Sequence, residues 1–138
     1  MALTSDIYAI TPTFSATLFR AAAVIGGAGA VALITNQPLD NGAGYKLLFS
    51  SVGDSSGINF TVAGFVVGDL TGNTTTEVVA GPAAGLTTKT VNYYSLITSV
   101  TIDGAATGNI SIGTLITDGV ALPRGRLRGF YYVATAGA

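Results

Sequence analysis

Hydrophobic and polar residues alternate along much of this chain, in short segments separated by glycine-rich turns. In the clearest case, the apolar residues Ile58, Phe60 and Val62 alternate with polar or small neighbours. A period of two is typical of a β-strand that buries one face. No segment has the period of an amphipathic helix, so the sequence predicts an all-β protein.

Strand candidates recur at short intervals along the rest of the chain. They lie at residues 31–34, 45–52, 74–80, 89–94, 96–102, 109–114, 115–122 and 126–134. Short strands with glycine turns between them are typical of an antiparallel two-sheet β-sandwich, and we expect one of jelly-roll or immunoglobulin-like type. Residues 1–24 contain Pro12 and no regular period. We therefore expect an extended N-terminal arm at residues 1–24 and the sandwich domain at residues 25–138.

The composition narrows the function. The 138 residues include no His, no Cys and no Trp, a single Glu and only 9% charged residues, and the net charge is −1. Without His or Cys, the common nucleophile–base pairs and zinc sites cannot be built. A net charge near zero gives no basic field for nucleic acid. We therefore expect no enzyme, cofactor or metal. A surface so poor in charge also tends to associate, so we expect a homo-oligomer or another large interface.

Two short motifs are similar to known signatures, and both fail. Residues 53–57 (GDSSG) look like the nucleophile segment of a serine protease, but the chain has no histidine to accept the serine proton. Residues 27–32 (GAGAVA) match a dinucleotide fingerprint, but Asn36 and Pro38 prevent the helix that it needs. We interpret both segments as turns.

The apolar run at residues 21–34 is too short to cross a bilayer, so we expect no membrane contact.

Most of the carboxylates also lie in turns. Asp54, Asp69 and Asp103 each stand beside or near glycine, where Asp forms local hydrogen bonds, while Glu77 lies in a predicted strand. A catalytic pair of carboxylates or a calcium site is therefore the weaker interpretation of these residues.

Half of the six basic residues lie close together near the C-terminal end, at Arg124, Arg126 and Arg128. In an extended strand, a spacing of two places all three guanidinium groups on one face. Arginine suits paired hydrogen bonds to carboxylates across an interface. The same charges on an edge strand would prevent aggregation, and contact with nucleic acid is a third use. We expect the interface role first and no nucleic-acid partner.

Aromatic residues toward both ends of the chain are the other candidates for an interface. They are Tyr131 and Tyr132 in the last predicted strand, and Phe14 and Phe19 in the predicted arm. Aromatic side chains are enriched in interface cores, which supports this prediction. A platform on which sugar rings stack is the alternative use of the tyrosines.

Four segments follow one another in a distinctive order. They are SSVGDSSGINFTVAG at residues 50–64, a Gly-Asp and Gly-Asn hairpin at 68–73, TEVVAGP at 76–82, and TVNYYSLITSVTIDGAATGNISIG at 90–113. In this order and spacing, the chain resembles small virion proteins of tailed bacteriophages.

The resemblance implies a structural protein that binds the outer capsid surface and stabilises the shell, of the decoration or cement type. Its partners would be the major capsid protein or other virion proteins. The alternatives are a tail, neck or head-fibre component, or a carbohydrate-binding module of a host-recognition appendage.

Overall fold

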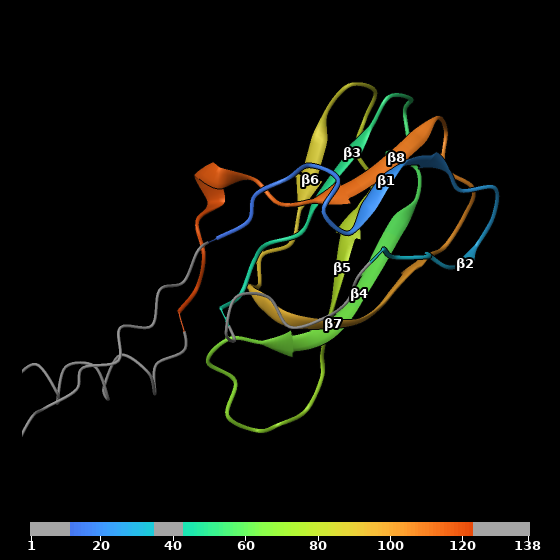
Figure 1. The fold of residues 1–138 in the computed structure, drawn as a ribbon. Coiled ribbons are helices and arrows are strands. Elements are labelled where there is room, and N and C mark those ends of the chain that lie inside the picture. Colours follow the sequence, from blue (N-terminus) through green and yellow to red (C-terminus); the bar gives the residue numbers. More distant parts are fainter. Residues whose placement is uncertain (1–11, 35–42, 123–138) are drawn as a thin grey trace, which may run out of the picture.

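The computed structural model describes residues 12–34 and 43–122 of the chain. In this part, two four-stranded antiparallel sheets pack as a sandwich (Figure 1). Sheet A has the strand order β1-β8-β3-β6 and sheet B the order β2-β7-β4-β5. The prediction of an all-β, two-sheet sandwich is confirmed.

The strands are short, as the spacing of the turns predicts. They are β1 (Arg20–Val24), β2 (Gly29–Ala30), β3 (Leu48–Ser51), β4 (Asn59–Val66), β5 (Thr75–Ala80), β6 (Thr87–Lys89), β7 (Tyr94–Ile102) and β8 (Asn109–Gly113). A 3-10 helix, η2 (Ile116–Asp118), follows β8.

The strands pair by a simple rule. β1 pairs with β8, β2 with β7, β3 with β6 and β4 with β5, always antiparallel. The chain is thus a two-stranded ribbon with the β4–β5 hairpin at its tip. Where the ribbon rolls up, β3 meets β8 and β4 meets β7. This nested pairing is a jelly roll, which decides between the two predicted types of sandwich.

The core lies between the two sheets. In β4 the buried residues Phe60 and Val62 alternate with the half-buried Thr61 and Ala63, as the sequence pattern predicts. Phe60 stacks on Phe49 of sheet A, with 4.6 Å between the ring centroids. This aromatic contact joins the sheets at the centre of the sandwich, where burying each ring stabilises the fold.

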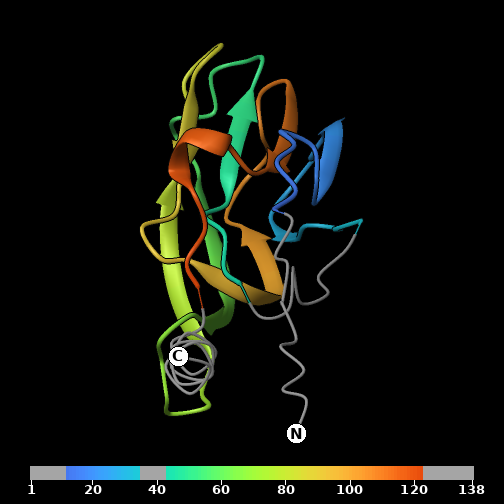
Figure 2. The same cartoon turned by 60° about the vertical axis from the view of Figure 1, so that its left-hand side comes forward.

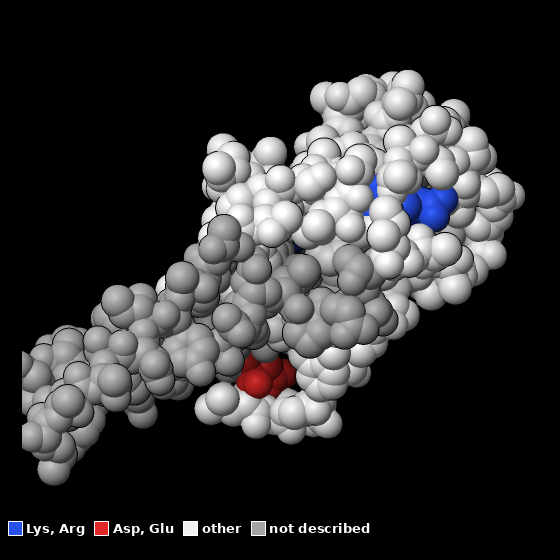
Figure 3. Space-filling model, in the orientation of Figure 1, with Lys and Arg blue, Asp and Glu red and all other residues white. Residues whose placement is uncertain are grey.

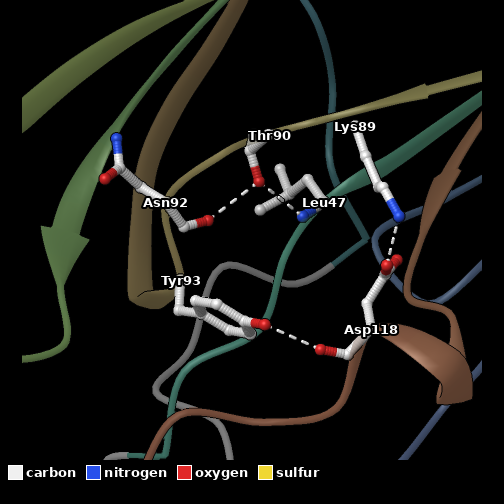
Figure 4. Close-up of polar contacts among 6 residues, drawn as sticks. All are labelled: Leu47, Lys89, Thr90, Asn92, Tyr93 and Asp118. Carbon is white, nitrogen blue, oxygen red and sulfur yellow. Dashed lines mark hydrogen bonds and ion pairs between the residues drawn. The ribbon is translucent and has the colours of Figure 1, made fainter.

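The strand predicted at residues 45–52 is shortened to β3, and three other predicted strands are largely replaced by other structure. The strand predicted at residues 89–94 is not formed, since β6 ends at Lys89 and residues 90–93 form a loop. In this loop the Thr90 hydroxyl accepts a hydrogen bond from the Leu47 amide and donates one to the Asn92 carbonyl (Figure 4). Residues 115–122 form η2 and an isolated bridge at Ala121 instead of a strand. Of the segment around residues 31–34, only the preceding pair Gly29–Ala30 joins a sheet. The predicted strand at residues 126–134 lies outside the described residues.

The predicted boundary after residue 24 is wrong, because the described part of the arm belongs to the sandwich. β1 forms an edge of sheet A beside β8. Residues 12–19, which we call the strap, lie against the end of β8. The Ser15 amide donates to the Thr114 hydroxyl over 3.0 Å, and the Thr114 amide donates to the Ser15 carbonyl over 2.8 Å. Gly113 allows this close approach, since a Cβ there would overlap the backbone of Ser15 and Ala16.

Candidate interaction surfaces

The described part of the chain contains eight charged side chains, three basic and five acidic. They are Arg20, Lys46, Lys89, Asp54, Asp69, Glu77, Asp103 and Asp118. Each of them bonds to or lies against another group of the sandwich, in some cases within the same turn. For example, the Arg20 guanidinium donates to the Ala32 carbonyl over 3.0 Å, and Lys46 lies 5.1 Å from the centre of the Tyr93 ring. The charges therefore support the fold.

Three carboxylates hold turns or strand ends. Asp54 accepts hydrogen bonds from the hydroxyl and amide of Ser56, and these bonds hold the pKa of Asp54 below its usual value. Asp69 accepts hydrogen bonds from the amide and hydroxyl of Thr71, and these bonds lower the pKa of Asp69. Bonds from the amide and side chain of Asn59 lower the pKa of Asp103. The three groups behave as the Asp residues of turns are expected to behave.

A polar cluster joins the β6–β7 loop to η2 (Figure 4). Lys89, at the end of β6, forms an ion pair with Asp118 of η2. The Tyr93 hydroxyl donates to the backbone carbonyl of Asp118 over 2.8 Å. Both contacts hold the segment after β8 against the end of the sandwich. Because these polar groups bond one another, we assign the cluster the structural role of joining the β6–β7 loop to η2.

Glu77 is the acceptor of a second cluster, at the β5 side of the sandwich. Its carboxylate accepts from the backbone amides of Val91 and Asn92 and from the Asn92 side chain. The Tyr94 hydroxyl lies 3.4 Å from the same carboxylate. The single glutamate of the chain is thus used to hold the β6–β7 loop against β5.

Replacing Glu77 by Gln should destabilise the fold, by about 1–2 kcal/mol. Glutamine keeps one acceptor oxygen, but its amide group turns a donor toward amides that already donate. The free energy of unfolding in guanidinium chloride measures the loss. Asp54→Asn, at an exposed turn, is the matched control and should lose less. Equal losses in the two variants would contradict the role assigned to Glu77.

The GDSSG segment at residues 53–57 forms a turn, as predicted. Ser55 is 3% exposed, and its hydroxyl donates to the Thr107 carbonyl over 3.1 Å and accepts from the Thr107 amide. The Ser51 hydroxyl donates to the same carbonyl over 3.2 Å. The buried serines therefore bind the β3–β4 turn to the β7–β8 turn, and neither is placed to attack a substrate.

The outer face of sheet B has a different character. We define the sheet B face by its outward residues Thr76 and Val78 on β5, Thr61, Ala63 and Phe65 on β4, and Leu96, Ser99 and Thr101 on β7. No member is charged. Val78, Thr61 and Thr101 lie opposite one another across three strands, and Val78 is 64% exposed. An uncharged face of this kind is suited to contact with another protein.

Large apolar side chains are also exposed beyond this face. They are Val24, Ile34, Val52, Leu70, Leu86, Val91, Leu115, Ile116 and Leu122. Leu70, in the β4–β5 loop at the tip of the ribbon, is 98% exposed. On the face of the molecule drawn in Figure 3, charged side chains occupy only small areas. The surface of the described part therefore combines few charged side chains with several large exposed apolar ones.

The predicted interface residues have different outcomes. Phe19 is 1% exposed and packs in the core, so placing it at a surface interface was wrong. The β1–β8 pairing draws it between the sheets, since its amide donates to the Ile112 carbonyl. Phe14 is half-buried, with its ring edge-on to Tyr45 at 5.7 Å. The remaining candidates, Arg124, Arg126, Arg128, Tyr131 and Tyr132, lie outside the described residues.

The sheet B face was not among the predicted sites. Its residues were visible as the outward members of predicted strands, but the strand order that brings them together was not. Of the described tyrosines, Tyr45 and Tyr94 are each 1% exposed, and Tyr93 is half-buried beside Lys46. In residues 12–34 and 43–122, the tyrosines therefore form no platform for sugar rings.

Residues 12–34 and 43–122 place no three His, Cys, Asp or Glu side chains together as metal ligands. Within these ranges, no helix has the length and apolar character needed to cross a membrane. No family model, curated protein or solved structure matches the chain.

Proposed function

We propose that this chain is a structural protein of a bacteriophage particle that binds the outer capsid surface and stabilises the shell. The observation that carries the proposal is the uncharged sheet B face together with the exposed apolar side chains around it. About 25% of the residues in a typical soluble domain are charged, compared with 9% in this chain. Here the described charges are engaged in holding turns, loops and strand ends, so the outward surface favours permanent protein contacts.

The fold and the sequence agree with this role. Jelly rolls occur in viral capsid proteins and in lectins, although a fold alone does not assign a function. The segments at residues 50–64, 76–82 and 90–113, which resemble phage virion proteins, form the turns and strands of this jelly roll. Between a capsid and a lectin role, the burial of Tyr45 and Tyr94 favours the capsid role.

Stabilisation would follow from mass action. A subunit that binds the assembled lattice and not the dissociated capsid protein shifts the equilibrium toward the lattice. The sheet B face would supply apolar contact, with shape and not charge determining the fit. The described residues carry three basic and five acidic groups, a difference of −2, which gives no attraction for nucleic acid.

The number of copies per particle tests the proposal. We expect quantitative mass spectrometry of purified particles to give a ratio to the major capsid protein near one or a simple fraction of one. A ratio of a few per cent would instead indicate a neck, tail or fibre component. Absence from the particle would contradict any virion role.

A lysine at Ser99, on the β7 part of the sheet B face, should lower this occupancy at least about tenfold, because burying an unpaired charge costs several kcal/mol. Thr87→Lys is the matched control, since Thr87 is an exposed strand residue of sheet A. If both variants bind particles equally well, the sheet B face is not the capsid-binding surface.

A further inference from the structure

The sandwich has four edge strands, and they differ in how they are protected. β1 and β6 are the edges of sheet A, and β2 and β5 are the edges of sheet B. An edge strand exposes unpaired backbone N–H and C=O groups, which can pair with a strand of another molecule. Proteins prevent such pairing with short edges, bulges, lysines and prolines.

Three of the edges carry such protection. β1 has an irregular register between Arg20 and Ala23, and Arg20 adds a charge. β2 is only two residues long. β6 is three residues long and ends at the exposed Lys89. These three strands are therefore poor templates for a further strand.

β5 lacks these four devices, although one of its outward backbone groups, the Ala80 carbonyl, already accepts a hydrogen bond from the Thr88 hydroxyl. Its six residues pair with β4 in an unbroken register, from Thr75 opposite Gly64 to Ala80 opposite Asn59. It contains no Lys, Arg or Pro, and its one charged residue, Glu77, accepts hydrogen bonds from the β6–β7 loop. Val78, at the middle of the strand, is 64% exposed. Figure 2 shows β5 as the yellow-green strand at the left margin of the sandwich.

The direction of its backbone groups follows from two hydrogen bonds. The Ala80 carbonyl accepts from the Thr88 hydroxyl over 2.7 Å, so it points away from β4. The next amide, that of Gly81, donates to the Ile58 carbonyl and so points toward the β4 side. Because these directions alternate along a strand, the backbone N–H and C=O groups of Thr76 and Val78 also point away from β4. Among the described residues, no hydrogen bond reaches their outward N–H and C=O groups.

We propose that β5 pairs antiparallel with β5 of a second copy, about a two-fold axis at Val78. The two B sheets then form one continuous eight-stranded sheet. In this register Thr76 lies opposite Ala80 and Glu77 lies opposite Val79, so no two carboxylates face each other. A two-fold contact of one edge with itself closes at two copies, and the protected edges prevent further addition. The pairing follows from the β5 edge and does not depend on a role in the virion.

Crosslinking through one introduced cysteine tests the register, because the natural chain has no cysteine. In the full-length Val78→Cys variant, the two Cα atoms would lie about 5.5 Å apart across the axis, as in any antiparallel pair that exchanges backbone hydrogen bonds. Thr61→Cys is the matched control, one strand further in on the same face. Its two thiols would be separated by three strand spacings, about 14 Å.

We expect mild oxidation to convert the Val78→Cys variant to disulfide-linked dimers at least about tenfold faster than the Thr61→Cys variant, since a disulfide joins residues whose Cα atoms are about 4.4–6.8 Å apart. Equal, fast crosslinking at both positions would indicate face-to-face packing and overturn the proposal. Slow crosslinking at both positions would also overturn it.

Sedimentation of the purified chain gives an independent test. The unmodified protein should show a concentration-dependent dimer. Val78→Lys should raise the dimer Kd at least about tenfold, and Thr61→Lys should change it much less, because a central strand has no free edge. A chain that stays monomeric up to millimolar concentration would overturn the pairing. The particle experiment is unaffected by either result, so the two proposals fail separately.

Discussion

Alanine at position 113 should lower the free energy of unfolding by about 3 kcal/mol, the upper end of the cost of overpacking a filled site. Gly113 ends β8, and its missing side chain would point to the outer side of sheet A, where the strap lies. A methyl group there would overlap the backbone of Ser15 and Ala16, which cannot move aside as a flexible side chain could. Unfolding in guanidinium chloride measures the loss.

The same variant should release the strap before the rest of the sandwich. Its hydrogen bonds to Thr114 require the close approach that Gly113 allows. Trypsin should then cleave after Arg20 faster than in the unmodified protein. Gly57→Ala is the matched control, since an added Cβ there has open space around it. Unchanged stability and cleavage in Gly113→Ala would mean that the strap does not lie on Gly113.

Raising the pH should produce the second large effect, through Tyr94. Burial, and next to it the negative charge of Glu77, raise the pKa of Tyr94 to about 12 from its usual value of 10.0. A folded-state pKa above the unfolded one means that folding favours the protonated hydroxyl. This contribution is complete below pH 10 and is lost as the pH rises toward 12. Two pKa units correspond to about 3 kcal/mol.

Comparing variants assigns the alkaline loss to this residue. The free energy of unfolding, measured between pH 9 and pH 12, should fall less steeply in Tyr94→Phe than in the unmodified protein. Tyr93→Phe should keep the full loss, because Tyr94 is intact. If the slope with pH is the same in all three proteins, ionisation of Tyr94 does not limit alkaline stability.

Local patterns in the sequence predict four of the strands well or nearly so. β8 and β5 fall almost where the alternation places them, and β4 and β7 are longer than predicted. β1 was missed because Ala21, Ala22 and Ala23 show no alternation and are exposed. Their strand conformation comes from pairing with β8, nearly ninety residues away along the chain. The error about Phe19 has the same cause, because that pairing carries it into the core.

The interaction surfaces were beyond local reasoning for a related reason. The sequence shows that Thr61, Val78 and Thr101 are outward members of their strands. That they lie in one row depends on the order β7-β4-β5, which only the folded chain defines. The unprotected edge at β5 depends on the same order. The predicted interface residues from Arg124 to Tyr132 remain predictions.

The rolled ribbon also determines when each part of the molecule can fold during synthesis. The β4–β5 hairpin is local and can close as soon as residue 80 has left the ribosome. β1 is made first, but it must wait for β8, which ends at residue 113. Until then sheet A lacks the strand that lies between β1 and β3. The nascent chain therefore exposes unpaired strands for most of its translation, and a slow final closure from the two ends of the ribbon is expected.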